Sequence, residues 1–162
     1  MPHPAKPDWI EPPCPAPDFT LADHHGNSIT LSKLLGQSVV LYFYPRDNTP
    51  GCTAEACAFR DRYDELTRHN AVLLGVSGDS AEDHTAFAEK YALPFPLLVD
   101  ADHAVASAYG AYREKNMYGK KSMGIQRSTF IINPEGDVVK TFKRVKVDGH
   151  DQQVLDALKT LQ

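Results

Sequence analysis

Two continuous apolar runs dominate the pattern of hydrophobic and polar positions along the chain. They span residues 38–44 and 72–77, and both are rich in β-branched and aromatic side chains. Runs of this length without polar alternation are typical of strands buried on both faces of a sheet. A shorter run at residues 97–99 predicts a third strand. We therefore expect a sheet whose centre is covered on both sides.

Helical spacing of apolar residues fills the segments between these runs. Residues from about 50 to 69 predict one helix, and a second is expected to open at Ser80, where Asp83 lies three residues further on in a capping arrangement. A short helical piece is expected at 105–109, and residues 154–161 predict a final amphipathic helix. Strands joined through helices imply parallel pairing.

Two hairpins are predicted outside this βαβ core. Apolar positions alternate between residues 19 and 31 around His25-Gly26-Asn27, which indicates an N-terminal β-hairpin. Residues 126–132 and 137–142 flank Asn133-Pro134-Glu135-Gly136, which indicates a late hairpin of antiparallel strands. The expected fold class is α/β, with a mixed central sheet flanked by helices.

Residues 1–17 are rich in proline, which excludes a regular helix or a central strand there. We expect an extended N-terminal arm, pinned by Trp9 and Ile10. Neither a repeat nor a later linker interrupts the remainder, so residues 18–162 are interpreted as a single domain.

Composition narrows the functional classes. The net charge is −4 and no basic block is present, which argues against a nucleic-acid partner. No apolar run approaches the roughly 18–20 residues that cross a membrane, and no secretory signal is visible. Three cysteines are too few, and odd in number, for a disulfide scaffold. We therefore expect a cytoplasmic, reducing location in which the cysteines serve chemistry.

Residues 45–57 carry the most informative chemistry. A buried strand leads through a tight loop to a predicted helix start, with Thr49 as N-cap and Pro50 at the first helical position. Cys52 then falls at the third helical position, among backbone N–H groups that lack intrahelical partners. Because helix N-termini stabilise negative charge, this placement favours a thiolate. We interpret the segment as the active site of a redox enzyme.

The spacing of Cys52 and Cys57 has a geometric consequence. Five residues on a regular helix give about 7.5 Å of rise and about 140° of rotation. A disulfide requires facing side chains with Cα atoms about 5.5–6 Å apart. If the two thiols react with each other, the first turns of the helix must therefore unwind.

A metal centre and a cofactor are not expected. The two cysteines lack Cys-x-x-Cys spacing, and His69 lies too far along the same helix to complete a compact site. The seven histidines are scattered and are expected to be solvated at the surface: His3, His24, His25, His69, His84, His103 and His150.

Three segments resemble one known family. They are Tyr-Pro-Arg-Asp-Asn-Thr-Pro-Gly-Cys-Thr-Ala-Glu-Ala-Cys (44–57), Ala-Pro-Asp-Phe-Thr-Leu (16–21) and Gly-Ile-Gln-Arg-Ser-Thr-Phe (124–130). They are similar to the peroxiredoxins, in the bacterioferritin comigratory protein or Q-type branch. The resemblance implies a thioredoxin-like fold and a thiol-dependent peroxidase that acts on hydrogen peroxide and organic hydroperoxides.

The resemblance also implies roles for particular residues. Pro45, Thr49 and Cys52 match the pattern Pro-x-x-x-Thr-x-x-Cys, in which the cysteine is the peroxidatic nucleophile. The family's active-site arginine corresponds to Arg127, which we place on a predicted strand at 125–132. Alternation puts Arg127 on a buried face, where a charge needs a specific partner.

Further roles follow from the same resemblance. Glu55 is similar to the glutamate that orients the arginine, although an exposed helix acid is an equal alternative. Cys57 matches the resolving cysteine of many members, and Cys14, in the arm, is expected to be incidental. The implied reductant is thioredoxin or a similar dithiol, and the implied state is a monomer.

Two other functions remain open at this point. A thiol–disulfide oxidoreductase of the same fold is disfavoured by the missing Cys-x-x-Cys and by Ser128 where a cis-proline is expected. A peroxide sensor or chaperone would use the same cysteines without sustained turnover. The basic segment 113–124 is expected to be a solvated loop, with the alternative that it borders the site and influences contact with substrate or reductant.

Overall fold

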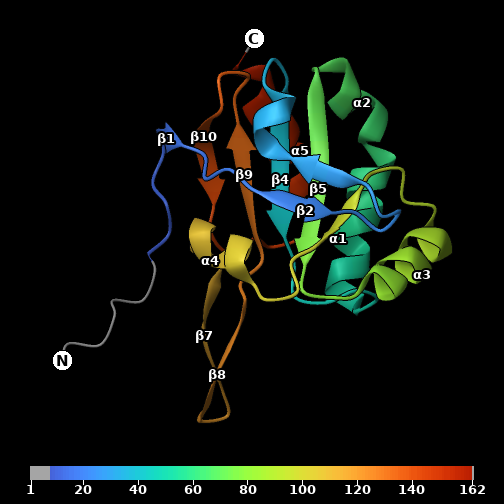
Figure 1. Ribbon diagram of the computed structural model, residues 1–162, viewed down its shortest axis with the longest axis vertical. Coiled ribbons are helices and arrows are strands. Elements are labelled where there is room, and N and C mark those ends of the chain that lie inside the picture. The colour runs from blue at the N-terminus through green and yellow to red at the C-terminus, as the bar shows by residue number, and fades with distance from the viewer. Residues whose placement is uncertain (1–7, 162) are drawn as a thin grey trace.

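The computed structural model describes residues 8–161, and a six-stranded mixed sheet lies at its centre (Figure 1). The strand order is β1-β10-β9-β4-β5-β6, in which β4, β5 and β6 are parallel and β9 runs antiparallel to β4. The bounds are β1 Cys14–Pro15, β4 Ser38–Phe43, β5 Ala71–Ser77, β6 Leu97–Val99, β9 Ser128–Ile132 and β10 Asp137–Phe142. The mixed sheet expected from the sequence is thus confirmed.

The two apolar runs form the centre of this sheet. Every residue of β4 is buried, and β5 is buried at all but one position. Alternate residues of β4 point to opposite faces, so that Val40 and Tyr42 enter one hydrophobic cluster while Val39 and Leu41 enter the other. The absence of polar alternation in the sequence therefore reflects a strand covered on both sides.

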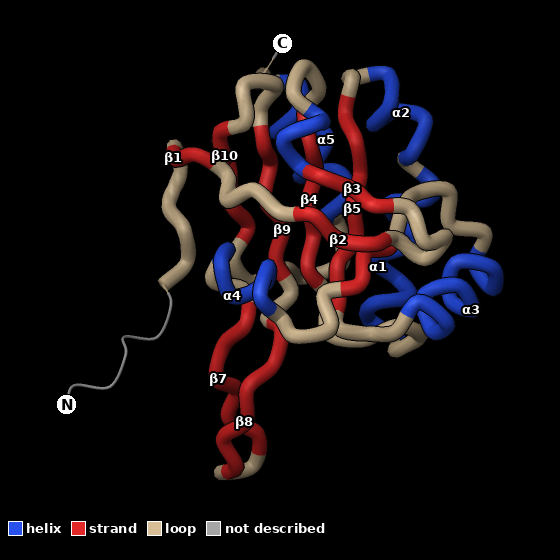
Figure 2. Tube along the Cα trace, viewed as in Figure 1, coloured by secondary structure: helices blue, strands red, loops and turns tan. Residues whose placement is uncertain are grey.

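Helices cover one face of the sheet, and the other face is covered by the N-terminal hairpin and one short helix (Figures 1 and 2). The helices are α1 Pro50–Asp61, α2 Tyr63–Arg68, α3 Ala81–Tyr91, α4 Ala104–Tyr109 and α5 His150–Lys159. The first face packs against α1, α2, α3 and α5, and the second against α4, the hairpin of β2 (Thr20–Ala22) and β3 (Ser28–Thr30), and the 3₁₀ helix Leu31–Leu34.

The single helix expected over residues 50–69 is wrong in one respect, because the helix breaks at Arg62. This residue has φ −103° and ψ 5°, and it separates α1 from α2. Its guanidinium binds Asp151 of α5 at 3.0 Å and Glu65 of α2 at 3.0 Å. The break is held by contacts to a helix 89 residues away, which periodicity does not reveal.

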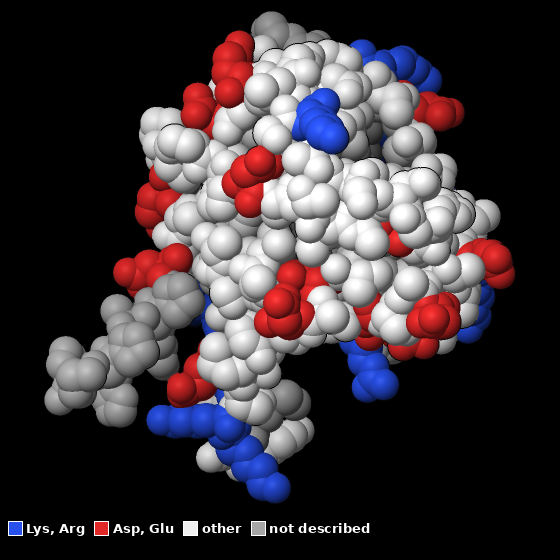
Figure 3. All heavy atoms as spheres, in the orientation of Figure 1, with Lys and Arg blue, Asp and Glu red and all other residues white. Residues whose placement is uncertain are grey.

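The expectation of a loop at 113–124 is also wrong, although the segment is largely exposed, as expected. Strands β7 (Tyr112–Met117) and β8 (Lys120–Ile125) form a hairpin that projects from the domain (Figure 2). Its two turn residues, Tyr118 and Gly119, both have positive φ, as a two-residue hairpin turn requires. Lys120 and Lys121 are exposed, and basic side chains gather on this projection in Figure 3. The pattern of hydrophobic residues does not predict this hairpin, because little of it is buried.

Part of the proline-rich arm lies outside the described residues, namely 1–7. From residue 8 the arm follows the sheet edge, Trp9 and Ile10 pack against the second hydrophobic cluster, and Cys14–Pro15 pair with β10. In the described part of the chain, no helix is long and apolar enough to cross a membrane.

Candidate active site

The loop that follows β4 delivers Cys52 to a helix start, as the sequence predicts. Thr49 has the extended backbone of an N-cap (φ −84°, ψ 156°) and Pro50 opens α1. Cys52 is therefore the third helical residue, and its side chain is only 2% exposed. Its sulfur lies in the first turn, where the positive end of the helix dipole stabilises an anion.

Sheet topology brings Arg127 to the same place. Because β9 is antiparallel to β4, the start of β9 lies beside the end of β4, and Ser128 pairs with Phe43. Arg127 directly precedes Ser128, so it lies just outside the strand rather than on it as expected. Its Nη2 donates a hydrogen bond to Cys52 Sγ at 3.3 Å.

Glu55 completes the contact. It lies one turn after Cys52 on α1, is 2% exposed, and its Oε1 accepts from Arg127 Nη1 at 2.7 Å. The alternative of an exposed helix acid is thus excluded. Burial raises the pKa of the Glu55 carboxyl to about 7, although the charge and hydrogen bond of Arg127 act in the opposite direction. Its second oxygen, Oε2, has no hydrogen-bond partner among residues 8–161.

The positive charge of the Arg127 guanidinium lies beside the Cys52 sulfur. Burial lowers the pKa of Arg127, but Glu55 and Cys52 outweigh this effect, and the net shift is upward. The guanidinium is therefore permanently charged, and it stabilises a thiolate at 3.3 Å. Lys115 of β7 also lies within electrostatic reach of the site. Burial and then the Arg127 charge lower its pKa, and Cys52 acts in the opposite direction.

Gly51 permits the close approach of the arginine. A Cβ at this position would lie 3.0 Å from Arg127 Nη2. Any larger residue at position 51 would require the Arg127 guanidinium to move away from it. The lack of a side chain at position 51 therefore lets the guanidinium lie close to the first turn of α1 without being displaced.

Two other predicted site residues, Thr49 and Pro45, lie on the loop before α1. Thr49 is half-buried, and its hydroxyl donates to the Arg46 carbonyl at 3.0 Å; within the described chain it makes no capping bond. Pro45 is exposed on the same loop. The structure thus brings Cys52, Arg127 and Glu55 into contact, whereas Thr49 and Pro45 lie on the loop that leads into α1.

Both other cysteines are free thiols. Cys57 is half-buried and lies on the same uninterrupted helix α1 as Cys52, so the two are five residues apart on regular helix. Cys14 is half-buried on the edge strand β1, paired with β10. Burial, followed by the charges of Asp137 and Glu11, raises the pKa of the Cys14 thiol.

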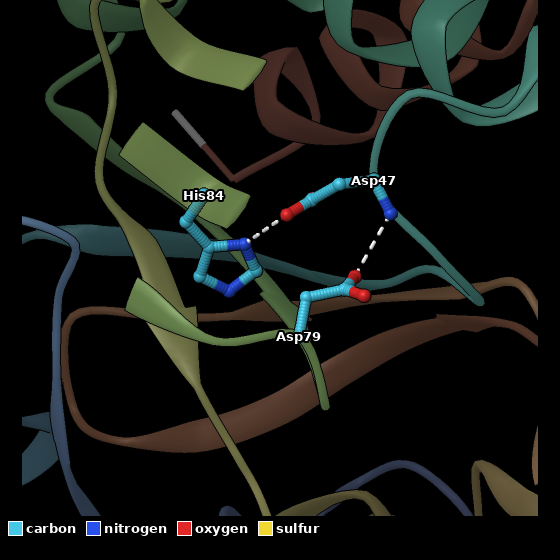
Figure 4. A group of neighbouring side chains, drawn as sticks. All are labelled: Asp47, Asp79 and His84. Atoms are coloured by element: carbon cyan, nitrogen blue, oxygen red, sulfur yellow. Dashed lines mark hydrogen bonds and ion pairs between the residues drawn. The ribbon is translucent and has the colours of Figure 1, made fainter. Parts of the chain in front are cut away.

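Sequence reasoning missed a buried polar cluster beside the loop. His84 and His150 are buried, contrary to the expected surface role of the histidines. His84 contacts Asp47 of the active-site loop, and Asp47 also contacts Asp79 (Figure 4). A signal was present, since His84 precedes Phe87 by three residues and His150 precedes Val154 by four, which places each on an apolar helix face.

Asp47, Asp79 and His84 also offer ligand atoms within 4.8 Å of one another. Both ring nitrogens of His84 and both carboxylate oxygens of Asp47 are already engaged in hydrogen bonds within the protein. This group is therefore built as a hydrogen-bond network.

A buried thiol at a helix start, contacted by an arginine just before the start of a central strand, defines a thiol-dependent enzyme of thioredoxin-like fold. Comparison with known proteins agrees. The model of the AhpC/TSA family matches residues 13–141. Peroxiredoxin Bcp of Bacillus subtilis is 48% identical over 146 residues, which are 90% of this chain and 93% of that protein.

Solved structures give the same result. Peroxiredoxin Q of Xanthomonas campestris superposes with a TM-score of 0.85 at 45% identity, covering 88% of this chain and 90% of that one. A second structure, of the Xanthomonas campestris bacterioferritin comigratory protein, has a TM-score of 0.85 at 44% identity with the same coverage and is described as giving insights into alkyl peroxide reduction activity. This chain belongs to the AhpC/TSA family, as one of its Bcp or Q-type peroxiredoxins. Peroxiredoxins are thiol-dependent peroxidases.

Proposed function

We propose that Cys52 is the peroxidatic nucleophile and that it reduces hydrogen peroxide and organic hydroperoxides. The observation that carries this assignment is the hydrogen bond from Arg127 Nη2 to Cys52 Sγ at 3.3 Å. The Xanthomonas campestris relative, whose described activity is on alkyl peroxides, supports the inclusion of organic hydroperoxides among the substrates.

The first step transfers one oxygen atom. The Cys52 thiolate attacks one peroxide oxygen, an S–O bond forms and the O–O bond breaks. The second oxygen leaves as hydroxide or alkoxide and then takes up a proton. Cys52 is converted to a sulfenic acid by this step. Arg127 and the backbone N–H of Cys52 stabilise charge as it moves from sulfur to oxygen. Glu55 positions Arg127.

Two loop residues complete the site in this proposal. The Thr49 hydroxyl, which donates to Arg46 in the resting site, turns toward the peroxide when substrate binds. Pro45 shields the sulfur from bulk water and from further oxidation. Neither the site nor the reaction employs a metal or an organic cofactor.

The second step forms a disulfide. The Cys57 thiol attacks the sulfenic sulfur of Cys52, an S–S bond forms, and the oxygen leaves as water. Because both residues lie on α1, its first turns unwind before this step. A dithiol, thioredoxin or a similar protein, then reduces the disulfide by exchange and is itself oxidised.

The cellular setting follows from these assignments. The protein acts as a monomeric antioxidant enzyme in the cytoplasm, where a dithiol reductant is present. We assign residues 18–162 to the single catalytic domain and residues 1–17 to an N-terminal arm, whose described part, residues 8–17, lies along the edge of the sheet. Neither nucleic acid nor a membrane is a partner.

Mass spectrometry after one equivalent of peroxide tests the cysteine assignments, with each cysteine replaced by serine in turn. Cys57→Ser should retain a sulfenic acid at Cys52, which a 1,3-diketone traps. Cys14→Ser should form the Cys52–Cys57 disulfide as the wild type does, and Cys52→Ser should remain unoxidised. A disulfide to Cys14 in the wild type, or a first oxidation at Cys57, would refute the proposal.

A further inference from the structure

Four residues in and beside the active-site loop form a largely buried polar group, which we call the His84 cluster: Tyr44, Asp47, Asp79 and His84. Asp47 lies in the loop between β4 and α1, three residues before Pro50, and His84 lies on α3. His84 is fully buried and Asp47 nearly so. A buried charge or polar group of this kind is unfavourable unless it is fully paired.

Hydrogen-bond geometry fixes the protons of His84. Nε2 lies 2.9 Å from the Leu98 carbonyl oxygen, which only accepts, so Nε2 carries a hydrogen. Nδ1 lies 2.5 Å from Asp47 Oδ2, and the other Asp47 oxygen accepts from the Tyr44 hydroxyl at 2.6 Å. Burial lowers the pKa of His84, but the hydrogen bond and charge of Asp47, the Leu98 carbonyl and Asp79 outweigh it. The net shift in the pKa of His84 is upward, which favours an imidazolium that donates from Nδ1 to Asp47 Oδ2.

The backbone of the loop is held as well. The N–H of Asp47 donates to Asp79 Oδ2 at 2.8 Å, and the same oxygen accepts from the Ser77 hydroxyl at 2.7 Å. Figure 4 shows His84 and Asp79 approaching Asp47 from separate elements. The next residue, Asn48, has a left-handed backbone (φ 61°), and its Oδ1 accepts weakly from Lys90 and Tyr91 of α3. Residues of helix α3 thus hydrogen-bond to two consecutive loop residues, Asp47 and Asn48.

This attachment bears on the reaction because the loop leads directly into the turn that carries Cys52. The reactive site needs that turn folded against Arg127, whereas disulfide formation needs the same turn unwound. A fixed point three residues upstream of α1 favours the first state over the second.

We propose that His84 is a positioning residue, which acts through Asp47 to hold the active-site loop in its peroxide-reactive form and thereby sets how readily the turn opens for the disulfide step. The proposal rests on the function proposed above for Cys52 and Cys57. His84 touches neither the sulfur nor the peroxide.

Two substitutions separate the contacts of His84. His84→Gln keeps a donor near the position of Nε2, toward Leu98, and loses the contact to Asp47. His84→Asn keeps a donor near the position of Nδ1, toward Asp47, without an ionisable ring. Tyr109→Phe is the matched control, because it removes a buried hydrogen bond, to the Pro17 carbonyl, on the opposite face of the sheet.

Rapid-mixing kinetics on the reduced full-length protein measure both steps, namely peroxide consumption by Cys52 and formation of the Cys52–Cys57 disulfide. His84→Gln should slow the first step about tenfold, the scale of one charged hydrogen bond, while the second step becomes faster. His84→Asn should restore both rates toward the wild type. Asp47→Asn should act in the same direction as His84→Gln, and combining the two should add little, because one acts through the other.

The pH dependence gives a readout that a purely structural role would not move. The groups that face His84 are Tyr44 and Asp47 from the loop, Asp79 after β5, the Leu98 carbonyl of β6, and His24, whose pKa is lowered by burial and by neighbouring charges that include His84. Because the folded-state pKa of His84 exceeds its ordinary value of 6.5, the pair is intact below pH 6.5 and is lost as pH rises through the folded-state pKa. The peroxide rate of the wild type relative to His84→Asn should fall over that range.

The outcomes separate the two proposals. If the wild type forms no Cys52–Cys57 disulfide, the proposed function fails. The positioning role is then decided by the peroxide step and by amide exchange at residues 47–48, which His84→Gln should accelerate. If His84→Gln leaves both rates unchanged, or changes them no differently from Tyr109→Phe, the positioning role of His84 is overturned. If His84→Gln does not fold, Asp47→Asn supplies the same comparison.

Discussion

Arg127 Nη2 lies 3.3 Å from Cys52 Sγ, although 75 residues separate them in the chain. The contact exists because β9 runs antiparallel to β4, so the beginning of one strand meets the end of the other. The same guanidinium is held by Glu55, which lies on the helix of Cys52. Helix α1 and the start of β9 therefore hold the guanidinium charge beside the Cys52 sulfur.

Replacing Arg127 tests that charge directly. Arg127→Gln should lower the second-order rate of peroxide reaction by about 100-fold, the scale of removing one donor that stabilises developing charge. Arg127→Lys should recover only part of this loss, since a lysine lacks the planar fork that reaches Glu55 and Cys52 together. Stopped-flow kinetics on the reduced protein measure the rate. Arg68→Gln, at an exposed position on α2, is the control and should match the wild type.

Gly51→Ala should separate activity from stability. The new Cβ would lie 3.0 Å from Arg127 Nη2 and displace the guanidinium by a few tenths of an ångström, so the peroxide rate should fall about tenfold. Alanine is the better helix former, by up to about 1 kcal/mol, so the free energy of unfolding should stay level or rise.

The control for this change is Gly124→Ala, whose Cβ would make only an ordinary contact, 3.4 Å from Lys115 Cδ. Its peroxide rate should stay near that of the wild type. A Gly51→Ala protein with full activity would show that the position of Arg127 does not limit the reaction.

Glu55 predicts a pH dependence of stability. Its folded-state pKa of about 7 lies above its ordinary value of 4.5, so the folded protein holds a proton that the unfolded chain releases. The contribution is fully present below pH 4.5 and is lost as pH rises through about 7. Relative to Glu55→Gln, the wild type should lose on the order of 3 kcal/mol of unfolding free energy across this range.

Urea unfolding of the two proteins between pH 4 and pH 8.5 measures this difference. Glu89→Gln, at an exposed position on α3, should follow the wild type throughout. A difference between wild type and Glu55→Gln that does not change with pH would mean that Glu55 is charged over the whole range.

The sequence predicted those parts of the fold that are determined by the local pattern of apolar and capping residues. Strands β4 and β5 are continuous apolar runs, Ser80 accepts from the Asp83 N–H as a capping residue, and Thr49-Pro50 opens α1 where expected. Each of these depends on neighbours a few residues away, which a single chain displays directly.

Features that depend on distant contacts were missed. The break at Arg62 is held by Asp151 of α5, and the burial of His84 is tied to Asp47 of the active-site loop. Arg127 was identified through the family resemblance, but it lies between the end of β8 at Ile125 and the start of β9 at Ser128 rather than on a strand. The β7–β8 hairpin is largely polar, so hydrophobic pattern does not reveal it.

Helix α1 carries both the assembled site and the segment that must open for the disulfide. Amide hydrogen exchange of residues 50–60 in the fully reduced protein and in the Cys52–Cys57 disulfide form tests this opening most directly. We expect strong protection in the reduced form, where α1 is continuous, and loss of protection across its first turns in the disulfide form. Equal protection in both states would contradict this account.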